Sequence, residues 1–244
     1  MNPETEKEAT TLAKEYKKLE ILKNIELGLA LPFPYFAPVK KALSRNSIQL
    51  GLQNIHAEKS GPFTGEVSFS MMANQKPLFT LIGHSERRAA GETNAMINQK
   101  ILTALKNKIT PIICVGETVR DDHGAFHRIV ADQITAALVN VPKAAISRIV
   151  IAYEPVWAIS SHATREATPE ECREMIIYIK KTLADLSGIS AKDMPRIMYG
   201  GSVNELNAHE YIDAGADGLL PGHLSLEPKK MQKLIYSLQV IPKK

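Results

Sequence analysis

The regular alternation of short apolar runs with amphipathic stretches constrains the fold of this chain more than any other feature. Seven runs are predicted to be strands, and each is followed by helical sequence: residues 27–31, 48–53, 78–82, 109–115, 149–153, 196–199 and 218–220. One more helix precedes the first run, with Asn2 as its expected cap. Because parallel neighbours need crossover helices, the pattern predicts a parallel α/β sheet.

The number of strands favours a barrel. Seven is an awkward number for a closed sheet, and no strand precedes the opening helix, so the simplest account is an eightfold barrel whose first strand is absent from this chain. A doubly wound sheet is the alternative, but no Gly-x-Gly-x-x-Gly fingerprint follows any run. The 244 residues, 44% of them hydrophobic, suffice for one large domain or two smaller ones. We favour a single domain over residues 1–244.

The charge and the cysteine content exclude several classes of protein. A net charge of +4 comes from scattered side chains, which excludes nucleic-acid and membrane binding as expectations. Only Cys114 and Cys172 occur, both on apolar backgrounds, so a disulfide framework is not expected. The polar stretch 4–20 excludes a secretory signal, and no apolar run is long enough to span a bilayer. We therefore expect a soluble, cytoplasmic protein.

Glu154 is the first candidate for catalysis. It directly follows the apolar run 149–153 and precedes Pro155, which ends the ladder of a strand, and Trp157, the only tryptophan. A surface glutamate that closes a strand is the simpler interpretation. A carboxylate held at a strand end against an apolar wall would act as a base, and strand ends are where barrels carry their catalytic groups.

His84 and two glycine turns also follow strands. His84 alone fits a structural histidine, but its place before a helix N-terminus would keep the ring neutral. Gly200-Gly201-Ser202 and Gly222 offer backbone N–H groups to an anion. Each turn alone is a weak signal, whereas together, on the last two strands, they match where barrels bind phosphate.

Several segments carry a resemblance to a known family. The chain contains GHSERR at 83–88, AYEPVWAI at 152–159 and YGGSV at 199–203, with supporting matches at 61–66 and 114–117. These segments resemble the signatures of triosephosphate isomerase, a TIM barrel, and the resemblance extends from Met1 to the last helix. It implies an intramolecular aldose–ketose isomerase of glycolysis and gluconeogenesis.

The resemblance also implies roles for single residues. Glu154 would be the base that moves a proton between neighbouring carbons of dihydroxyacetone phosphate and D-glyceraldehyde 3-phosphate. His84 would be the neutral electrophile that stabilises the enediolate; triosephosphate isomerase is the standard example of this pairing. Glu86 would be a second acid beside the site. Gly200, Gly201, Ser202, Gly222, His223 and Ser160 would surround the phosphate, and no metal or organic cofactor is implied.

The first departure from the family lies at the start of the chain. The family's first strand ends in Asn-x-Lys followed by Met-Asn, and Met1-Asn2 align with that Met-Asn. The strand and its lysine would then be missing, either because the start codon is assigned too late or because the gene is truncated. In both cases the sequence predicts a gap in the barrel and exposed ladder edges beside it.

Two further departures lie in the phosphate loops. After Ile159 the family usually reads Gly-Thr-Gly-Lys-Thr-Ala, whereas residues 160–167 are two residues longer and lack glycine. This loop is either weakened in closure or binds phosphate through Ser160, Ser161 or Arg165.

The other altered position is in the last phosphate loop. The family's Gly-Gly is Gly222-His223 here, after Pro221. His223 would either crowd the anion or donate a hydrogen bond to it. The sequence leaves both alternatives open.

These departures leave two hypotheses for function. One preorganised donor is worth roughly 3 kcal/mol of transition-state stabilisation, so this isomerase is expected to be impaired. The alternative is a weak or inactive member that binds a phosphorylated ligand or a protein. Retention of Glu154 and His84 favours the enzyme.

The loop at 61–66 bears on assembly. Phe63-Thr64-Gly65-Glu66 resembles the family's interdigitating loop, which implies a homodimer with twofold symmetry. A mobile surface loop of the same length is the simpler interpretation.

Overall fold

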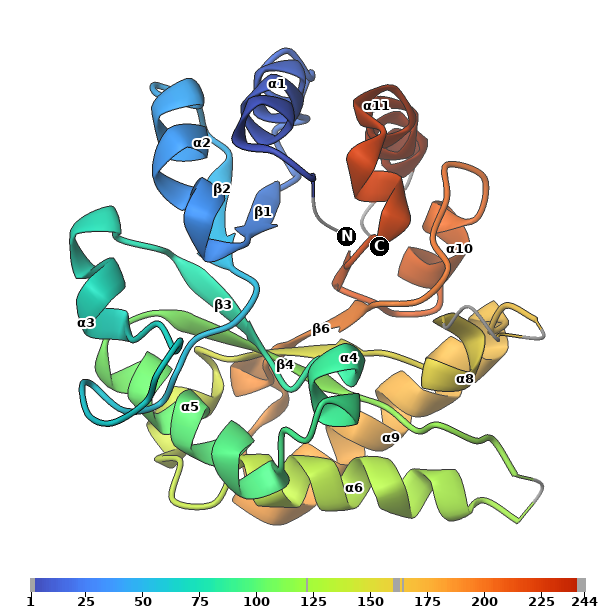
Figure 1. Cartoon of the computed structure of the whole chain (residues 1–244). Helices are drawn as coiled ribbons and strands as arrows, with labels where there is room; N and C mark the ends of the chain where they lie inside the picture. The colour runs from blue at the N-terminus through green and yellow to red at the C-terminus, as the bar shows by residue number, and fades with distance from the viewer. Residues whose placement is uncertain (1–2, 122, 160–162, 164, 241–244) are drawn as a thin grey trace.

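The computed structural model describes residues 3–121, 123–159, 163 and 165–240. Its centre is one parallel sheet whose strand order is the order of the chain, β1 to β7 (Figure 1). The strands are β1 Gly28–Leu31, β2 Gln49–Leu52, β3 Phe79–Ile82, β4 Thr110–Val115, β5 Val150–Tyr153, β6 Arg196–Tyr199 and β7 Gly218–Leu219. All seven predicted strands are confirmed, and the sheet is the curled, helix-covered sheet of a TIM-barrel fold.

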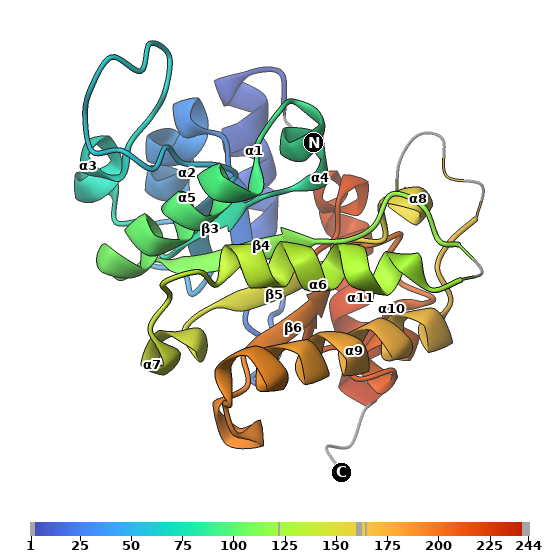
Figure 2. The same ribbon diagram turned by 90° about the horizontal axis from the view of Figure 1, so that it is seen from below.

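Helices cover the outside of the sheet. The main ones are α1 Glu6–Tyr16, α2 Phe36–Ala42, α5 Asn94–Lys106, α6 Ala125–Ala137, α9 Pro169–Ser187, α10 Ala208–Asp213 and α11 Pro228–Ser237. Short helices are α3 Phe69–Met72, α4 Ser85–Ala89, α7 Lys143–Ile146 and α8 Val156–Ile159, and 3₁₀ turns are η1 Phe33–Tyr35, η2 Ala73–Gln75, η3 Ala191–Asp193, η4 His223–Leu226 and η5 Leu238–Val240. Helices α6 and α9 run side by side below β4 to β6 (Figure 2). No helix among the described residues has the length and apolar character needed to cross a bilayer.

The helix ends follow local capping chemistry. In α9 the predicted capping box is confirmed, because the Thr168 and Glu171 side chains accept each other's backbone N–H groups. The predicted start of the first helix is wrong. Helix α1 begins at Glu6, and Thr5 is its N-cap because its hydroxyl accepts the N–H of Glu8 at 3.2 Å.

The strands differ in burial across the sheet. All four residues of β3 and all four of β5 are buried, which explains why both strands are mostly apolar. Thr80 in β3 is the polar exception, and its hydroxyl donates to the carbonyl of Leu81 at 3.2 Å. None of the residues of β1 or β7 is buried to the same degree. In the described part of the chain β1 and β7 each pair on one side only, so the sheet does not close on itself. We call the space between β1 and β7 the seam.

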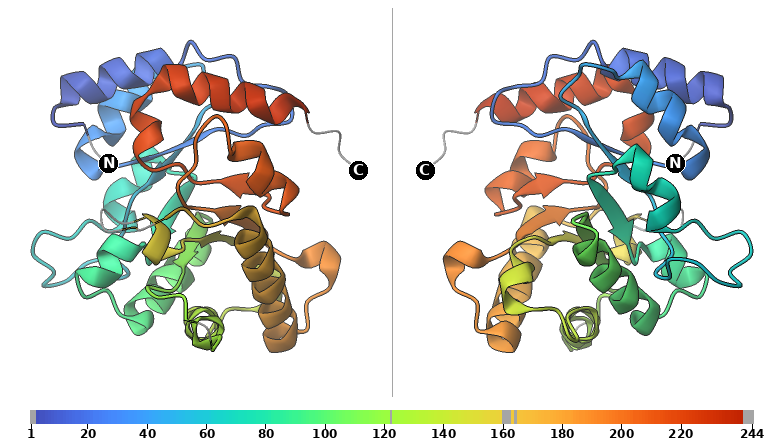
Figure 3. Two further views of the ribbon diagram at one scale, coloured as in Figure 1. Left: turned by 90° about the vertical axis from the view of Figure 1, so that its right-hand side faces the viewer. Right: turned by 90° about the vertical axis from the view of Figure 1, so that its left-hand side faces the viewer.

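The helix layer is closed where the sheet is open. The Tyr16 hydroxyl at the end of α1 donates to the carbonyl of Ser225 at 2.7 Å. The backbone of Glu20 exchanges two hydrogen bonds with the side chain of Gln232 on α11, at 2.8 and 3.0 Å. Both views of Figure 3 show α1 and α11 side by side over the seam. The expected gap in the barrel is therefore present in the strand layer and bridged in the helix layer.

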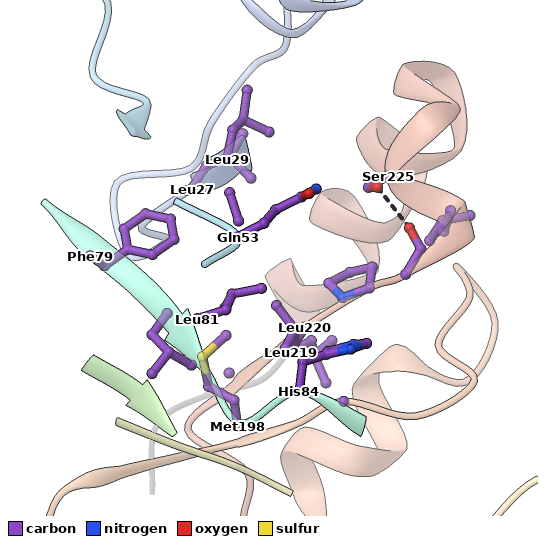
Figure 4. Close-up of a pocket in the computed structure, with 18 of the residues that line it drawn as sticks. Leu27, Leu29, Gln53, Phe79, Leu81, His84, Met198, Leu219, Leu220 and Ser225 are labelled. Carbon is purple, nitrogen blue, oxygen red and sulfur yellow. Dashed lines mark hydrogen bonds between the residues drawn. The ribbon is translucent and has the colours of Figure 1, made fainter. Parts of the chain in front are cut away.

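A cavity of about 1750 Å³ lies in the seam and extends to the carboxyl ends of the strands. Leu29 and Leu219, from the two seam strands, lie on opposite sides of it, and Phe79 and Leu81 form its floor (Figure 4). The Phe79 ring occupies the space that side chains at Gly28 and Gly51 would need, at 2.9 and 2.3 Å from their ideal Cβ positions. Met198 and Leu220 pack against the same cluster, so apolar side chains reach the seam from both sides.

Candidate active site

Glu154 lies at the carboxyl end of β5 and is 2% exposed. Its N–H donates to the carbonyl of Val115 at 2.8 Å, and Pro155 then ends the strand pairing. One carboxylate oxygen, Oε2, accepts the backbone N–H of Ser85 at 3.2 Å. Burial raises the pKa of Glu154 above its ordinary range. The site therefore holds a carboxylate that is more basic than one in water.

Gly116 allows the backbone to approach Glu154 closely. An ideal Cβ at residue 116 would lie 1.7 Å from the carbonyl oxygen of Glu154, so no side chain fits there. The Gln133 side chain of α6 fixes this glycine by accepting its N–H at 2.8 Å and donating to its carbonyl at 3.0 Å. The main chain that carries the base is therefore held from the neighbouring strand.

His84 follows β3 and is the N-cap of α4. Its Nδ1 accepts the backbone N–H of Glu86 at 3.3 Å, and its Nε2 lies 3.5 Å from Oε1 of Glu154. A ring nitrogen that accepts a backbone N–H carries no proton, so the geometry assigns a neutral imidazole whose proton is on Nε2. The structure thus brings the two main predicted residues together, with a donor and a base facing the same cavity.

Glu86 contributes mainly through its backbone. Its side chain is 81% exposed, and its carboxylate is 4.0 Å from Nδ1 of His84. The carboxylate therefore lies beside the ring and away from Glu154.

A buried ion pair lies behind His84. The Glu92 carboxylate accepts the N–H of Gly83 at 3.2 Å and pairs with Lys100, which also donates to Asn54 at 2.7 Å. Both Glu92 and Lys100 are buried. These contacts tie the turn that carries His84 to the end of β2.

The predicted phosphate residues line the same cavity as Glu154 and His84. Those described are Gly200, Gly201, Ser202, Gly222 and His223. The N–H of Gly200 is bonded to the carbonyl of Tyr153 at 2.8 Å. Within the described ranges, the N–H groups of Gly201 and Ser202 have no hydrogen-bond partner. These two N–H groups are therefore available to an anion.

The last phosphate segment is open. An ideal Cβ at Gly222 would meet no atom within 4 Å, and His223 is exposed on the cavity wall. Ser160, which the sequence also predicted to bind phosphate, and Ser161 lie outside the described residues.

The loop at 61–66 lies away from this cavity, between β2 and α3 (Figure 1). Phe63, Thr64, Gly65 and Glu66 are all exposed. The Phe63 ring packs on the ring of His56 with centroids 4.3 Å apart, and Glu66 lies 3.5 Å from that histidine. The loop is thus folded on itself and presents an exposed aromatic side chain.

Glu117 follows β4, and the sequence predicts no role for it. Its carboxylate is fully buried and accepts the Tyr153 hydroxyl at 3.0 Å and the Trp157 indole N–H at 2.7 Å. Burial raises the pKa of Glu117, and the indole hydrogen bond is the largest opposing effect. Its carbonyl accepts the N–H of Val156 at 3.0 Å. Glu117 therefore anchors the segment that follows the base, a link between residues 40 positions apart that local pattern does not reveal.

No group of three or more His, Cys, Asp or Glu side chains within the described ranges is arranged to hold a metal ion. The donors and the carboxylate around the cavity suit an organic anion, because they combine neutral N–H groups with one base.

Comparison with known proteins agrees with the geometry. The profile of the family described as triosephosphate isomerase matches residues 1–238. A triosephosphate isomerase of Carboxydothermus hydrogenoformans is 40% identical over 220 residues, covering 89% of this chain and 87% of the relative. One from Dehalococcoides mccartyi is 38% identical over 241 residues, covering 97% and 93% of the two chains. One from Chlorobaculum tepidum is 41% identical over 213 residues, covering 86% and 85%.

Proposed function

The chain belongs to the triosephosphate isomerase family and is an isomerase, and we propose that Glu154 is its catalytic base and His84 its electrophile. The substrate is a triose phosphate, interconverted between dihydroxyacetone phosphate and D-glyceraldehyde 3-phosphate through an enediolate. The observation that supports these roles is the pairing of Nε2 of His84 with Oε1 of Glu154 at 3.5 Å on one cavity wall. We place the reaction in glycolysis and gluconeogenesis in the cytoplasm.

The environment of Glu154 suits proton abstraction from carbon. Burial destabilises the carboxylate, so it binds a proton more strongly than an exposed glutamate does. The N–H of Ser85 holds Oε2, which leaves Oε1 facing His84 and the substrate space. Oε1 would remove a proton from one carbon of the substrate and return it to the neighbouring carbon.

The tautomer of His84 suits the second role. Because Nδ1 accepts the backbone N–H of Glu86, the proton on Nε2 is available to the substrate oxygen. A neutral donor polarises the carbonyl and stabilises the enediolate oxygen as negative charge develops there.

The anion end of the site would use main-chain donors. Gly201 and Ser202 follow β6, Gly222 and His223 follow β7, and all four line the same cavity. Two sets of N–H groups at the ends of the last strands suit the phosphate of a triose phosphate. The base and the anion site would then hold opposite ends of a three-carbon substrate.

The decisive experiment is a coupled assay of glyceraldehyde 3-phosphate isomerisation by the wild type and by Glu154→Gln. General base catalysis contributes about 10²- to 10⁴-fold, so the substitution should lower kcat by about that factor while leaving KM nearly unchanged. Glu210→Gln is the matched control, because this glutamate is exposed on α10 and does not line the cavity, and its effect should stay within about twofold. A wild type that folds but does not turn over would favour the alternative of a non-catalytic phosphate-binding member.

Assembly is a second part of the proposal. The exposed Phe63 loop and its likeness to the family's interdigitating loop support a homodimer with twofold symmetry. Sedimentation analysis should give a dimer for the wild type, and Phe63→Asp should weaken it because a charge would be buried at the interface. Met71→Asp, on another exposed apolar position, is the control. A monomeric wild type would contradict the dimer.

A further inference from the structure

Arg165 belongs to a closed ring of five side chains from two parts of the chain, the loop after β4 and the segment from α8 to the start of α9. Its members are Glu117, Arg120, Trp157, Arg165 and Glu171. Positive and negative charges alternate around this ring, with the indole between Glu117 and Arg165. Trp157 and Arg165 lie before and after the segment that corresponds to the family's phosphate loop.

Arg165 contacts two other members of the ring, Glu171 and Trp157. Its guanidinium donates to both oxygens of Glu171 at 2.8 and 2.7 Å, the fork-to-fork geometry that favours arginine over lysine. The same planar group lies 4.5 Å from the centre of the Trp157 ring, in a cation–π contact. Glu171 also accepts the N–H of Thr168 at 2.8 Å as part of the α9 capping box, so its position is fixed.

The other half of the ring leads to the catalytic segment. The Trp157 indole N–H donates to the buried carboxylate of Glu117 at 2.7 Å. Arg120, whose side chain is 13% exposed, lies 3.9 Å from Glu117 and 3.4 Å from Glu171, which closes the ring. Trp157 is three residues after Glu154, so its orientation constrains the turn that follows the base.

We propose that Arg165 is a positioning residue of the isomerase, which holds Trp157 against Glu117 and so orients the segment that follows Glu154. This inference depends on the proposed function. It replaces the expectation that Arg165 binds phosphate, because the guanidinium is engaged by Glu171 and stacked on the indole. Arg165 touches no reacting atom and acts through Trp157.

The single tryptophan makes the proposal measurable without substrate. Trp157 is the only one in the 244 residues, so all indole fluorescence reports on the ring. Arg165→Met keeps an apolar side chain but removes both the positive charge and the paired hydrogen bonds to Glu171. Arg165→Lys keeps the charge but cannot form the two parallel hydrogen bonds of a guanidinium. Both variants should shift the emission of Trp157, and Glu171→Gln should shift it in the same direction.

Steady-state kinetics supply the second readout. Arg165→Met should lower kcat about tenfold with KM within about twofold, because small misplacements near a base reduce the rate of the chemical step. The double variant Arg165→Met with Glu171→Gln should reduce kcat no more than the more harmful of the two single substitutions, because both substitutions break the same Arg165–Glu171 pair. Arg128→Met, on the exposed face of α6, is the matched control and should change neither readout.

The results of these experiments distinguish a failure of the positioning role of Arg165 from a failure of the proposed isomerase function. A rise in KM with unchanged kcat and unchanged emission would assign Arg165 to phosphate binding and overturn the positioning role. Loss of thermal stability alone, with both readouts unchanged, would make the ring merely structural and would also overturn it. If the wild type has no activity that Glu154→Gln abolishes, the proposed function fails and the positioning role fails with it.

Discussion

The enclosed strands β3 to β5 and the seam strands β1 and β7 have the same parallel topology but different surroundings. The enclosed strands are packed on both faces and have a hydrogen-bonded neighbour on each side. Among the residues that the structure describes, each seam strand pairs with one neighbour and faces the cavity. His84 and Glu154 follow β3 and β5, and Gly222 and His223 follow β7. Proton transfer is therefore proposed to depend on the enclosed part of the molecule, and one of the two anion-binding segments on the open part.

The largest difference in stability between the enclosed strands and the seam strands is expected when a glycine in or beside each is replaced by alanine. Gly116→Ala would place a methyl group 1.7 Å from the carbonyl oxygen of Glu154, and the atoms it would meet are all backbone atoms of Glu154, which cannot turn aside as a side chain can. We expect a loss of more than about 4 kcal/mol in the free energy of unfolding, or no folded protein. Gly218→Ala in β7 meets only Met198 at 3.4 Å and should change stability by less than about 1 kcal/mol. Urea denaturation of both variants checks this, and equal losses would contradict the contrast.

Truncation of apolar side chains is the next test. Ile113 in β4 is fully buried, so Ile113→Ala should cost about 2–5 kcal/mol through lost burial and a new cavity. Leu29 in β1 is only partly buried beside the seam, so Leu29→Ala should cost about 1 kcal/mol or less. Chemical denaturation measures both, and a Leu29 loss as large as that of Ile113 would show that the seam is packed in solution.

The pH dependence of stability tests the environment of Glu154. Its folded-state pKa is raised by burial above the ordinary value of 4.5, so ionisation in the folded state costs stability as the pH rises through that folded pKa. Glu154→Gln should therefore stabilise the protein near neutral pH by on the order of 1 kcal/mol. Below 4.5 the carboxyl is protonated in both states and the difference should vanish.

Glu171 is the control, because its removal should change the stability near neutral pH in the opposite direction from removal of Glu154. Arg165 holds the pKa of Glu171 below the ordinary value, so this carboxylate contributes stability above 4.5 that is lost as the pH falls through its folded pKa. Glu171→Gln should destabilise the protein near neutral pH. Thermal melts from acidic to neutral pH would distinguish the two, and curves of the same sign would contradict the assigned environments.

The smallest effect is expected at the seam. His223 is exposed beside Gly222, where the surrounding space is open, so His223→Ala should alter KM for the triose phosphate by about threefold or less and leave kcat unchanged. An increase in KM would indicate that His223 donates to the anion, and a decrease that it crowds it. A large fall in kcat would contradict the assignment of proton transfer to the enclosed region alone.

The elements could be predicted well because their signals are local. The strands β3 and β5 are mostly apolar runs, and their bounds differ from prediction by one residue at the start. The capping box at Thr168 was equally readable, since it needs only residues three apart. The start of α1 was missed because Asn2 and Thr5 are both competent caps, and local pattern does not rank them.

The arrangement of the site was less predictable. His84 and Glu154 were recognised from motifs, but their 3.5 Å approach and the tautomer of the ring depend on the turn that places the Glu86 N–H under Nδ1. The pairing of Arg165 with Glu171 crosses a loop, and that of Trp157 with Glu117 joins two strand ends. Contacts of this kind are set by packing between elements, which a single sequence does not encode in a readable local pattern.

The order of the strands has a consequence for how fast the molecule assembles. Every strand pairs with its neighbour in the chain, so each new pairing closes only one crossover connection. The hydrogen bonds that join the two ends, from Tyr16 to Ser225 and from Glu20 to Gln232, span 209 and 212 residues. Because the entropy of loop closure grows with length and local contacts favour rapid folding, the sheet would grow strand by strand. The meeting of α1 and α11 would then be the last folding event and the first to reverse.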